Sequence, residues 1–248
     1  MKDSQLSNNS ATSTMKHLLV MAFTMWVVSC GEEKVDGVNV DELEEREGVF
    51  YLKNSNSSYT GKAFSFHENG QKESAANFKD GKLEGLFARW YKNGQKDGET
   101  NFKGGEMDGL NIKWNKDGIK LSEQCWKNGE QNGAALEWHE NGQKKSEGNI
   151  ENGKINGMIS NWYENGQKKA EVNYTHGQKV GLSYVWYKSG EKQEEAIWKN
   201  GKLDGIMSIW HENGQTKGKA NFKDGEAISQ KYWNKKGEEV DSIEEAEQ

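Results

Sequence analysis

One unit of a repeating pattern reads GMISNWYENGQKKAEVNY at residues 157–174. It contains two short runs, and the tripeptide Glu164-Asn165-Gly166 separates them. Asn-Gly pairs accept the positive φ angles that tight hairpin turns require and that other residues resist. The unit is therefore predicted to be a β-hairpin.

The same pattern returns every 24 residues along most of the chain. The turn glycines are Gly70, Gly94, Gly118, Gly142, Gly166, Gly190 and Gly214, and the main aromatic column is Trp90, Trp114, Trp138, Trp162, Trp186 and Trp210. A second aromatic column is Phe78, Phe102, Trp126, Ile150, Tyr174, Trp198 and Phe222. This repetition predicts an all-β fold, an elongated single-layer antiparallel meander of tandem 24-residue hairpins.

The register follows from the turn length. If both turns of a unit are three-residue loops, Trp90 pairs with residue 96, and residues 88 and 86 pair with 98 and 100. The Trp column then shares a face with small residues and Phe102, whereas Glu and Asn columns and a mixed Tyr/His column lie on the opposite, solvated face. The Trp side must curl into a core or remain an apolar groove, and we expect core packing for most rings.

The solvated face is then the better candidate for recognition, because Tyr and His offer rigid area with a polar tip. The predicted partner-binding residues are Tyr91, His139, Tyr163, Tyr187 and His211.

The N-terminal residues have the pattern of an export signal. Lys16 and His17 precede an apolar run at residues 18–28, which is too short to span a bilayer. The run ends in Val27-Val28-Ser29-Cys30, which resembles the lipobox of bacterial lipoproteins. The resemblance implies export, cleavage before Cys30, and lipid on Cys30 that anchors the protein to a bacterial membrane, at the outer membrane or cell surface. A simple signal peptide or a short membrane anchor is the alternative.

Composition divides the chain into four predicted segments. They are a signal peptide at 1–29 with translation starting at Met15, an acidic tether at 30–47, the repeat domain at 48–237 and an acidic tail at 238–248. The repeat body is mildly basic between two acidic ends. A solvated surface explains this balance better than an anionic partner does.

Catalytic and metal sites are not predicted. Neighbouring histidines of one column, such as His67 and His139, are three hairpins apart, which is about 29 Å and too far to share a metal. The Glu column repeats one environment at about 9.6 Å spacing, so nothing separates an acid from a base. Cys125 occupies an Asn position of the repeat. We therefore predict no enzyme activity, no cofactor and no metal.

The recurring run WYENGQKK, followed by runs such as NFKDGK, resembles the MORN-repeat-variant family over residues 59–237. Members of this family are often labelled antitoxin components of bacterial toxin–antitoxin pairs. The resemblance implies an extended hairpin sheet used for protein contacts, and membrane-lipid binding is proposed for some MORN relatives.

The function predicted from these features is that of a non-enzymatic, membrane-anchored repeat scaffold, monomeric, which binds a protein and not nucleic acid. Neutralisation of that partner would be antitoxin-like. One alternative is a cell-wall or carbohydrate-binding module, because aromatic hairpin repeats of choline-binding proteins stack sugars or cage ammonium groups. The other is binding of anionic lipid by the Lys-bearing turns.

Overall fold

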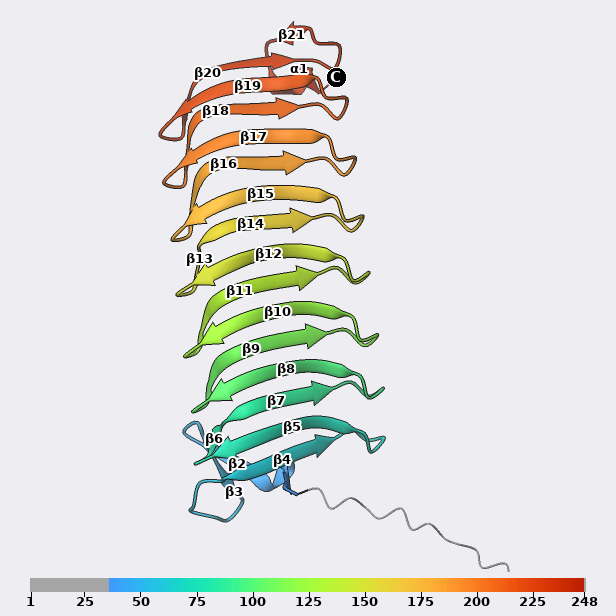
Figure 1. Ribbon diagram of the computed structural model, residues 1–248, viewed down its shortest axis with the longest axis vertical. Helices are drawn as coiled ribbons and strands as arrows, with labels where there is room; N and C mark the ends of the chain where they lie inside the picture. Colours follow the sequence, from blue (N-terminus) through green and yellow to red (C-terminus); the bar gives the residue numbers. More distant parts are fainter. Residues whose placement is uncertain (1–35, 248) are drawn as a thin grey trace, which may run out of the picture. The chain divides into compact units, whose positions relative to one another are not determined.

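The computed structural model describes residues 36–247, and this part is built almost wholly from β-strands (Figure 1). A 19-stranded sheet dominates it. The remaining elements are a two-stranded sheet of β2 (Leu43–Arg46) and β3 (Val49–Leu52), a short 3-10 helix (Val40–Glu42) and α1 (Ile243–Ala246). The predicted all-β class is confirmed.

The large sheet consists of β1 (Val38–Asn39), β4 (Gly61–Phe66), β5 (Lys72–Lys79), β6 (Lys82–Leu83), β7 (Gly85–Trp90), β8 (Lys96–Lys103), β9 (Glu106–Trp114), β10 (Lys120–Lys127), β11 (Glu130–Trp138), β12 (Lys144–Glu151), β13 (Lys154–Ile155), β14 (Gly157–Trp162), β15 (Lys168–Thr175), β16 (Gln178–Trp186), β17 (Lys192–Lys199), β18 (Lys202–Trp210), β19 (Thr216–Lys223), β20 (Glu226–Trp233) and β21 (Glu239–Val240).

Strands that follow one another in the chain are neighbours in the sheet, as Figure 1 shows from β4 to β21. All these pairs are antiparallel, and β1 adds a parallel pair to β4. The two-residue strands β6 and β13 precede β7 and β14 and share their partner strands. The predicted open meander of tandem hairpins is confirmed.

One of the two turns of a unit differs from the prediction in length. Thr175 pairs with Gln178, so only His176 and Gly177 form that turn, and their φ angles of 50° and 83° are those of a type I′ turn. At the other end Trp162 pairs with Lys168, and within the five-residue connection the backbone N–H of Tyr163 donates to the carbonyl oxygen of Gln167 at 2.9 Å, which leaves the predicted three-residue loop Glu164-Asn165-Gly166. The prediction of a three-residue loop therefore agrees with the structure at the Asn-Gly turn and was wrong at the other turn, and the turn glycines adopt positive φ at both.

The register is also corrected. Trp90 pairs with Lys96 as predicted, but a β-bulge follows, and Ala88 then pairs with Glu99 and Leu86 with Asn101. The bulge inserts one extra residue into β8, and one residue reverses which face the following side chains occupy. The Trp column therefore shares its face with the Glu and Asn columns.

We call this surface the Trp face; it carries Leu86, Ala88, Trp90, Lys96, Glu99 and Asn101 and their equivalents in other repeats. The opposite surface is the Phe face, which carries Phe87, Gly98, Thr100, Phe102 and their equivalents. The rings of Phe87 and Phe102 lie 6.3 Å apart on it, which agrees with the corrected register.

The Phe face is covered at both ends. At the first hairpin Phe78 packs with Leu43 and Tyr59, which precede its first strand β4 in the chain. At the last hairpin α1 lies against β19 and β20, and its Ala246 is fully buried. Residues 38–46 and 239–246, assigned by composition to the acidic tether and tail, thus form structure, because a few apolar side chains among the acids cover the ends of the Phe face.

Candidate interaction face

A row of exposed aliphatic side chains follows the Trp face at the edge nearest the two-residue turns. One residue of each repeat contributes, and the large members are 40–53% exposed: Leu86, Leu110, Met158, Leu182 and Ile206. Because equivalent strands are two strands apart, members in neighbouring repeats are about 9.6 Å from each other, and the small Ala134 occupies the position between Leu110 and Met158. We call these five residues the aliphatic row. Contiguous exposed apolar surface of this kind commonly marks an interaction site.

The backbone beneath two members of the aliphatic row is fixed by Asn side chains. The side-chain amide of Asn77 donates to the carbonyl oxygen of Leu86, and that of Asn101 donates to the carbonyl oxygen of Leu110, both at 3.1 Å. A free Cys125 replaces Asn in the next repeat and pairs with Leu110 in the sheet. Asn77 and Asn101 therefore stabilise the strands that present Leu86 and Leu110.

A ladder of Trp, Lys and Glu occupies the middle of the Trp face. The ammonium of a Lys in one repeat lies over the Trp ring of the next, at 5.3–5.9 Å from the ring centre, for Trp90, Trp114, Trp138, Trp162, Trp186 and Trp210. From Lys96 onward the same Lys pairs with the Glu three residues later; the other pairs are Lys120–Glu123, Lys144–Glu147, Lys168–Glu171 and Lys192–Glu195. The Trp rings from Trp114 to Trp210 therefore each face a cation that is itself neutralised.

The predicted partner-binding residues lie at the start of the five-residue connections, directly after the Trp column. The hydroxyls of Tyr91, Tyr163 and Tyr187 donate to the carbonyl oxygens of Trp114, Trp186 and Trp210 in the next repeat, at 2.7–2.8 Å. The Nε2 atoms of His139 and His211 make the equivalent contacts to Trp162 and Trp233 at 2.9 Å.

These contacts tie successive repeats together at one edge of the sheet. Desolvation raises the pKa of the Tyr91 and Tyr187 phenols above the ordinary value, and His211 is only 5% exposed. The polar tips that were predicted to recognise a partner are thus engaged within the fold. Their role in binding a partner stays a prediction.

The Asn of each Asn-Gly loop has a second structural role that the turn argument missed. The amide of Asn141 donates to the carbonyl oxygen of Glu164 at 2.7 Å, and its Oδ1 accepts from the backbone N–H of Gln143 at 3.0 Å. Asn69, Asn93, Asn165 and Asn213 make the same link to the next loop. The 24-residue spacing of these Asn residues was the available signal.

The described residues contain neither a metal-ligand cluster nor a membrane-spanning helix. In residues 36–247 no three His, Cys, Asp or Glu side chains come together as a metal site would require. Within the same residues no helix is both long and apolar enough to cross a membrane. Cys30 and the proposed export signal lie outside the described residues.

The fold and this face together place the protein in a structural class. It is the class of open antiparallel sheets that are built from hairpin repeats and present an extended face. The family model described as the MORN repeat variant matches residues 59–80, 131–152, 155–176 and 203–224. The chain therefore carries repeats of the MORN-variant type at these four places. MORN repeats are non-catalytic scaffolds that generally mediate contacts with proteins or membranes. A search of curated proteins found no match.

Proposed function

We propose that this protein is a non-enzymatic repeat scaffold that binds a protein partner through the Trp face. The observation that carries the proposal is the aliphatic row. Leu and Met side chains that are 40–53% exposed recur at fixed spacing on a face that neither end cap covers. Burying such side chains against a partner is favourable by about 25 cal/mol for each Å² of apolar area.

The charged ladder beside the row supports specificity. Its Lys and Glu side chains form two parallel columns of opposite charge, and a partner with complementary charges would be oriented across the face by them. Partner neutralisation, as an antitoxin performs it, would need no chemistry beyond this surface.

Sugar stacking along the Trp column is the weaker alternative. A pyranose that stacks on Trp162 would first have to displace the ammonium of Lys144, which lies 5.3 Å from the ring centre. Anionic lipid is also less favoured, because the loops that would face a membrane mix charges, with Glu164 and Glu212 in some and Lys92 and Lys188 in others.

The cellular part of the proposal is that Cys30 carries lipid and holds the exported protein at a bacterial membrane. Because one acyl chain binds only marginally, two or three chains are expected. Cys30→Ala should release the protein from the membrane fraction. Retention of this variant in that fraction would overturn the anchor and leave the scaffold role intact.

The scaffold role is tested by removing the aliphatic row. Leu110→Ser, Met158→Ser and Leu182→Ser are combined in one protein, and Ile228→Ser, on an exposed side chain of β20 outside the row, is the matched control. We expect the triple variant to capture at least tenfold less partner from solubilised membranes than the parent does. The control should capture as much as the parent. Equal capture by both variants would contradict binding through the row.

A further inference from the structure

The last hairpin departs from the repeat at two positions of the Trp face. Lys occupies one position in six repeats, from Lys72 to Lys192, and Thr216 replaces it in the last. Glu occupies a second position in five repeats, from Glu99 to Glu195, and Lys219 replaces it. Both members of the ion pair that characterises the ladder are therefore changed at one site.

These two changes leave an aromatic ring and a cation without their usual partners. No cation–π contact to Trp233 is found within residues 36–247, whereas each of the six preceding Trp rings has one. In the same part of the chain Lys219 has no ion-pair partner, and it lies directly across the sheet from Lys231. Like charges in directly opposite positions repel each other; Glu239 neutralises Lys231, and an anion bound at Lys219 would neutralise the other member of the pair.

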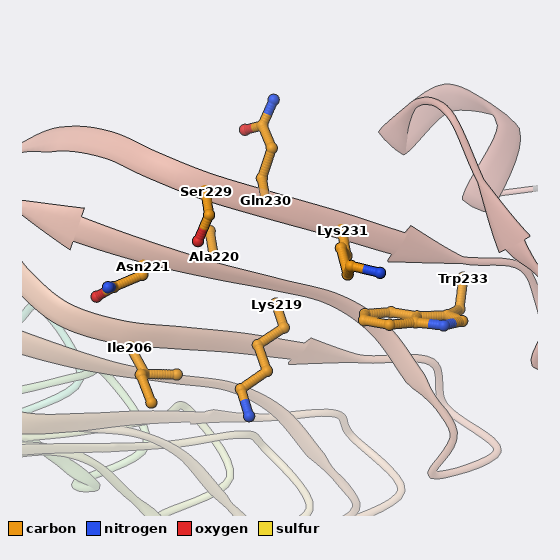
Figure 2. Close-up of a pocket in the computed structure, with 8 residues that line it drawn as sticks. All are labelled: Ile206, Lys219, Ala220, Asn221, Ser229, Gln230, Lys231 and Trp233. Carbon is orange, nitrogen blue, oxygen red and sulfur yellow. The ribbon is translucent and has the colours of Figure 1, made fainter.

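The side chains around this pair enclose a hollow of about 300 Å³. Its lining includes Ile206, Asn221, Ser229 and Trp233, and Figure 2 shows them on one side of the sheet with Lys219 and Lys231, whereas Gln230 points to the other side. A neighbouring hollow of about 520 Å³ shares Lys219 and Trp233. Ligand pockets in proteins begin at about 300 Å³, so the space suits a single sugar unit.

We infer that this site binds an anionic sugar, a pyranose that carries a carboxylate. The apolar face of the ring would lie on the uncovered Trp233, and the carboxylate would accept from the Lys219 ammonium. The Asn221 amide and the Ser229 hydroxyl supply hydrogen-bonding groups for the ring hydroxyls. Lys231 is held by Glu239 at 2.9 Å, so Lys219 is the cation free to bind the ligand.

The site does not depend on the protein-binding role, because it lies beyond the first four members of the aliphatic row and shares only the last, Ile206, with it. The site also lacks the feature that disfavours sugars elsewhere on the Trp face. Lys covers the six preceding Trp rings, and no Lys of the described residues covers Trp233. A uronate could reach it as a free sugar or as a unit of an acidic polysaccharide, and the recognised chemistry is the same.

The experiment titrates the purified full chain with methyl β-glucuronide and, as the matched neutral probe, with methyl β-glucoside, by saturation-transfer NMR. Two single variants, Lys219→Glu and Thr216→Lys, restore in the last hairpin the residues that the preceding repeats carry at these positions. Because the preceding repeats fold with these residues, loss of binding cannot be assigned to misfolding. Lys120→Thr, which uncovers Trp138 beside Glu123, is the control for an exposed Trp ring alone.

We expect the glucuronide to bind at least about tenfold more tightly than the glucoside, which is the usual effect of one charge-assisted hydrogen bond. Each repeat-restoring variant should weaken glucuronide binding at least about tenfold, and Lys120→Thr should bind as the parent does. Equal binding of the two probes, undiminished binding by Lys219→Glu, or no glucuronide binding by the parent would each overturn the proposal.

Discussion

The two faces of the sheet are built on different principles. On the Phe face, small residues such as Ala63 and Ala76 are almost fully buried, and additional segments cover the ends. On the Trp face, the large aliphatic residues stay exposed and the aromatic rings are covered by charged side chains of the neighbouring repeat. One face therefore resembles a thin conventional core, and the other is stabilised by contacts between adjacent repeats.

The difference shows how a single-layer sheet leaves apolar surface available. The Trp column needs no second layer, because each ring is covered by a Lys from the repeat before it. The aliphatic row has no such cover. A partner can bind the row without competing with the contacts that hold the repeats together, and this separation can be tested by the predictions below.

The largest effect is expected from deleting half a repeat. Removal of residues 133–144 takes out one strand, so every later strand would run in the opposite direction and the loops would change edges. The links from Tyr163 and Tyr187 to the following repeat could no longer form on one edge with those of Tyr91. We expect loss of the sheet signal in far-UV circular dichroism.

The matched deletion removes residues 133–156, a whole period. It rejoins equivalent positions of neighbouring hairpins, and each repeat contacts only its neighbours, so a shorter folded protein should result. Urea unfolding of the two variants side by side makes the comparison. If both lost sheet and cooperativity equally, contacts between adjacent repeats would not be the source of stability.

The period, the hairpin and the all-β class could be predicted because they depend on glycine and aromatic spacing that any reader of the sequence can count. The faces could not, because a single bulged residue before Gly98 reverses them, and bulges leave no composition signal. The end caps were missed for another reason. Leu43 and Phe50 stand in or beside an acidic stretch whose charge dominated the interpretation.

The next prediction separates the two faces by stability. Phe78 on the Phe face is 7% exposed and lies 5.0 Å from the Phe50 ring, so Phe78→Ala should lower the free energy of unfolding by about 3–5 kcal/mol. Trp162 is partly exposed and is covered mainly by Lys144, so Trp162→Ala should cost about 2 kcal/mol. Urea titrations of both variants measure the two values. A larger loss for Trp162→Ala would make the Trp face the true core.

The site itself was only partly predictable. The Tyr and His column was chosen for its polar tips, and nothing in the sequence says that these tips reach the backbone of the next repeat. The aliphatic row and the Lys column do recur every 24 residues, but their exposure depends on the corrected register. The 24-residue spacing identifies the aliphatic row and the Lys column in the sequence. The face on which they lie depends on the bulge.

A smaller effect is expected at the loop edge. Tyr163→Phe removes the hydroxyl that donates to the backbone carbonyl oxygen of Trp186 at 2.7 Å. This change should lower the free energy of unfolding by about 1 kcal/mol. Tyr174→Phe is the matched control, since no hydrogen bond of its hydroxyl is found within residues 36–247. Unchanged stability with weakened partner binding would restore Tyr163 to the recognition role first predicted for it.

The smallest effect concerns an acid on the Phe face. Glu194 lies between Val185 and Ile209 of the adjacent strands, and desolvation there raises the pKa of its carboxyl, with the Lys179 ammonium opposing the shift. The folded protein therefore retains this proton to higher pH than the unfolded chain does. Stability falls as pH rises from the unfolded to the folded pKa, and above both values the loss is constant.

Glu194→Gln removes this ionisation, so at pH 7.5 the variant should be more stable than the parent, and the difference should shrink toward about pH 4, where the parent carboxyl is protonated in both states. Glu171→Gln is the control on the Trp face. It removes the ion pair to Lys168 and should lower stability at pH 7.5 by no more than about 1 kcal/mol. Urea unfolding of the three proteins at both pH values measures the differences. If Glu194→Gln were destabilising at pH 7.5, the carboxylate would have to make a favourable contact on the Phe face, and the contrast between a desolvated face and a charge-paired face would fail at this position.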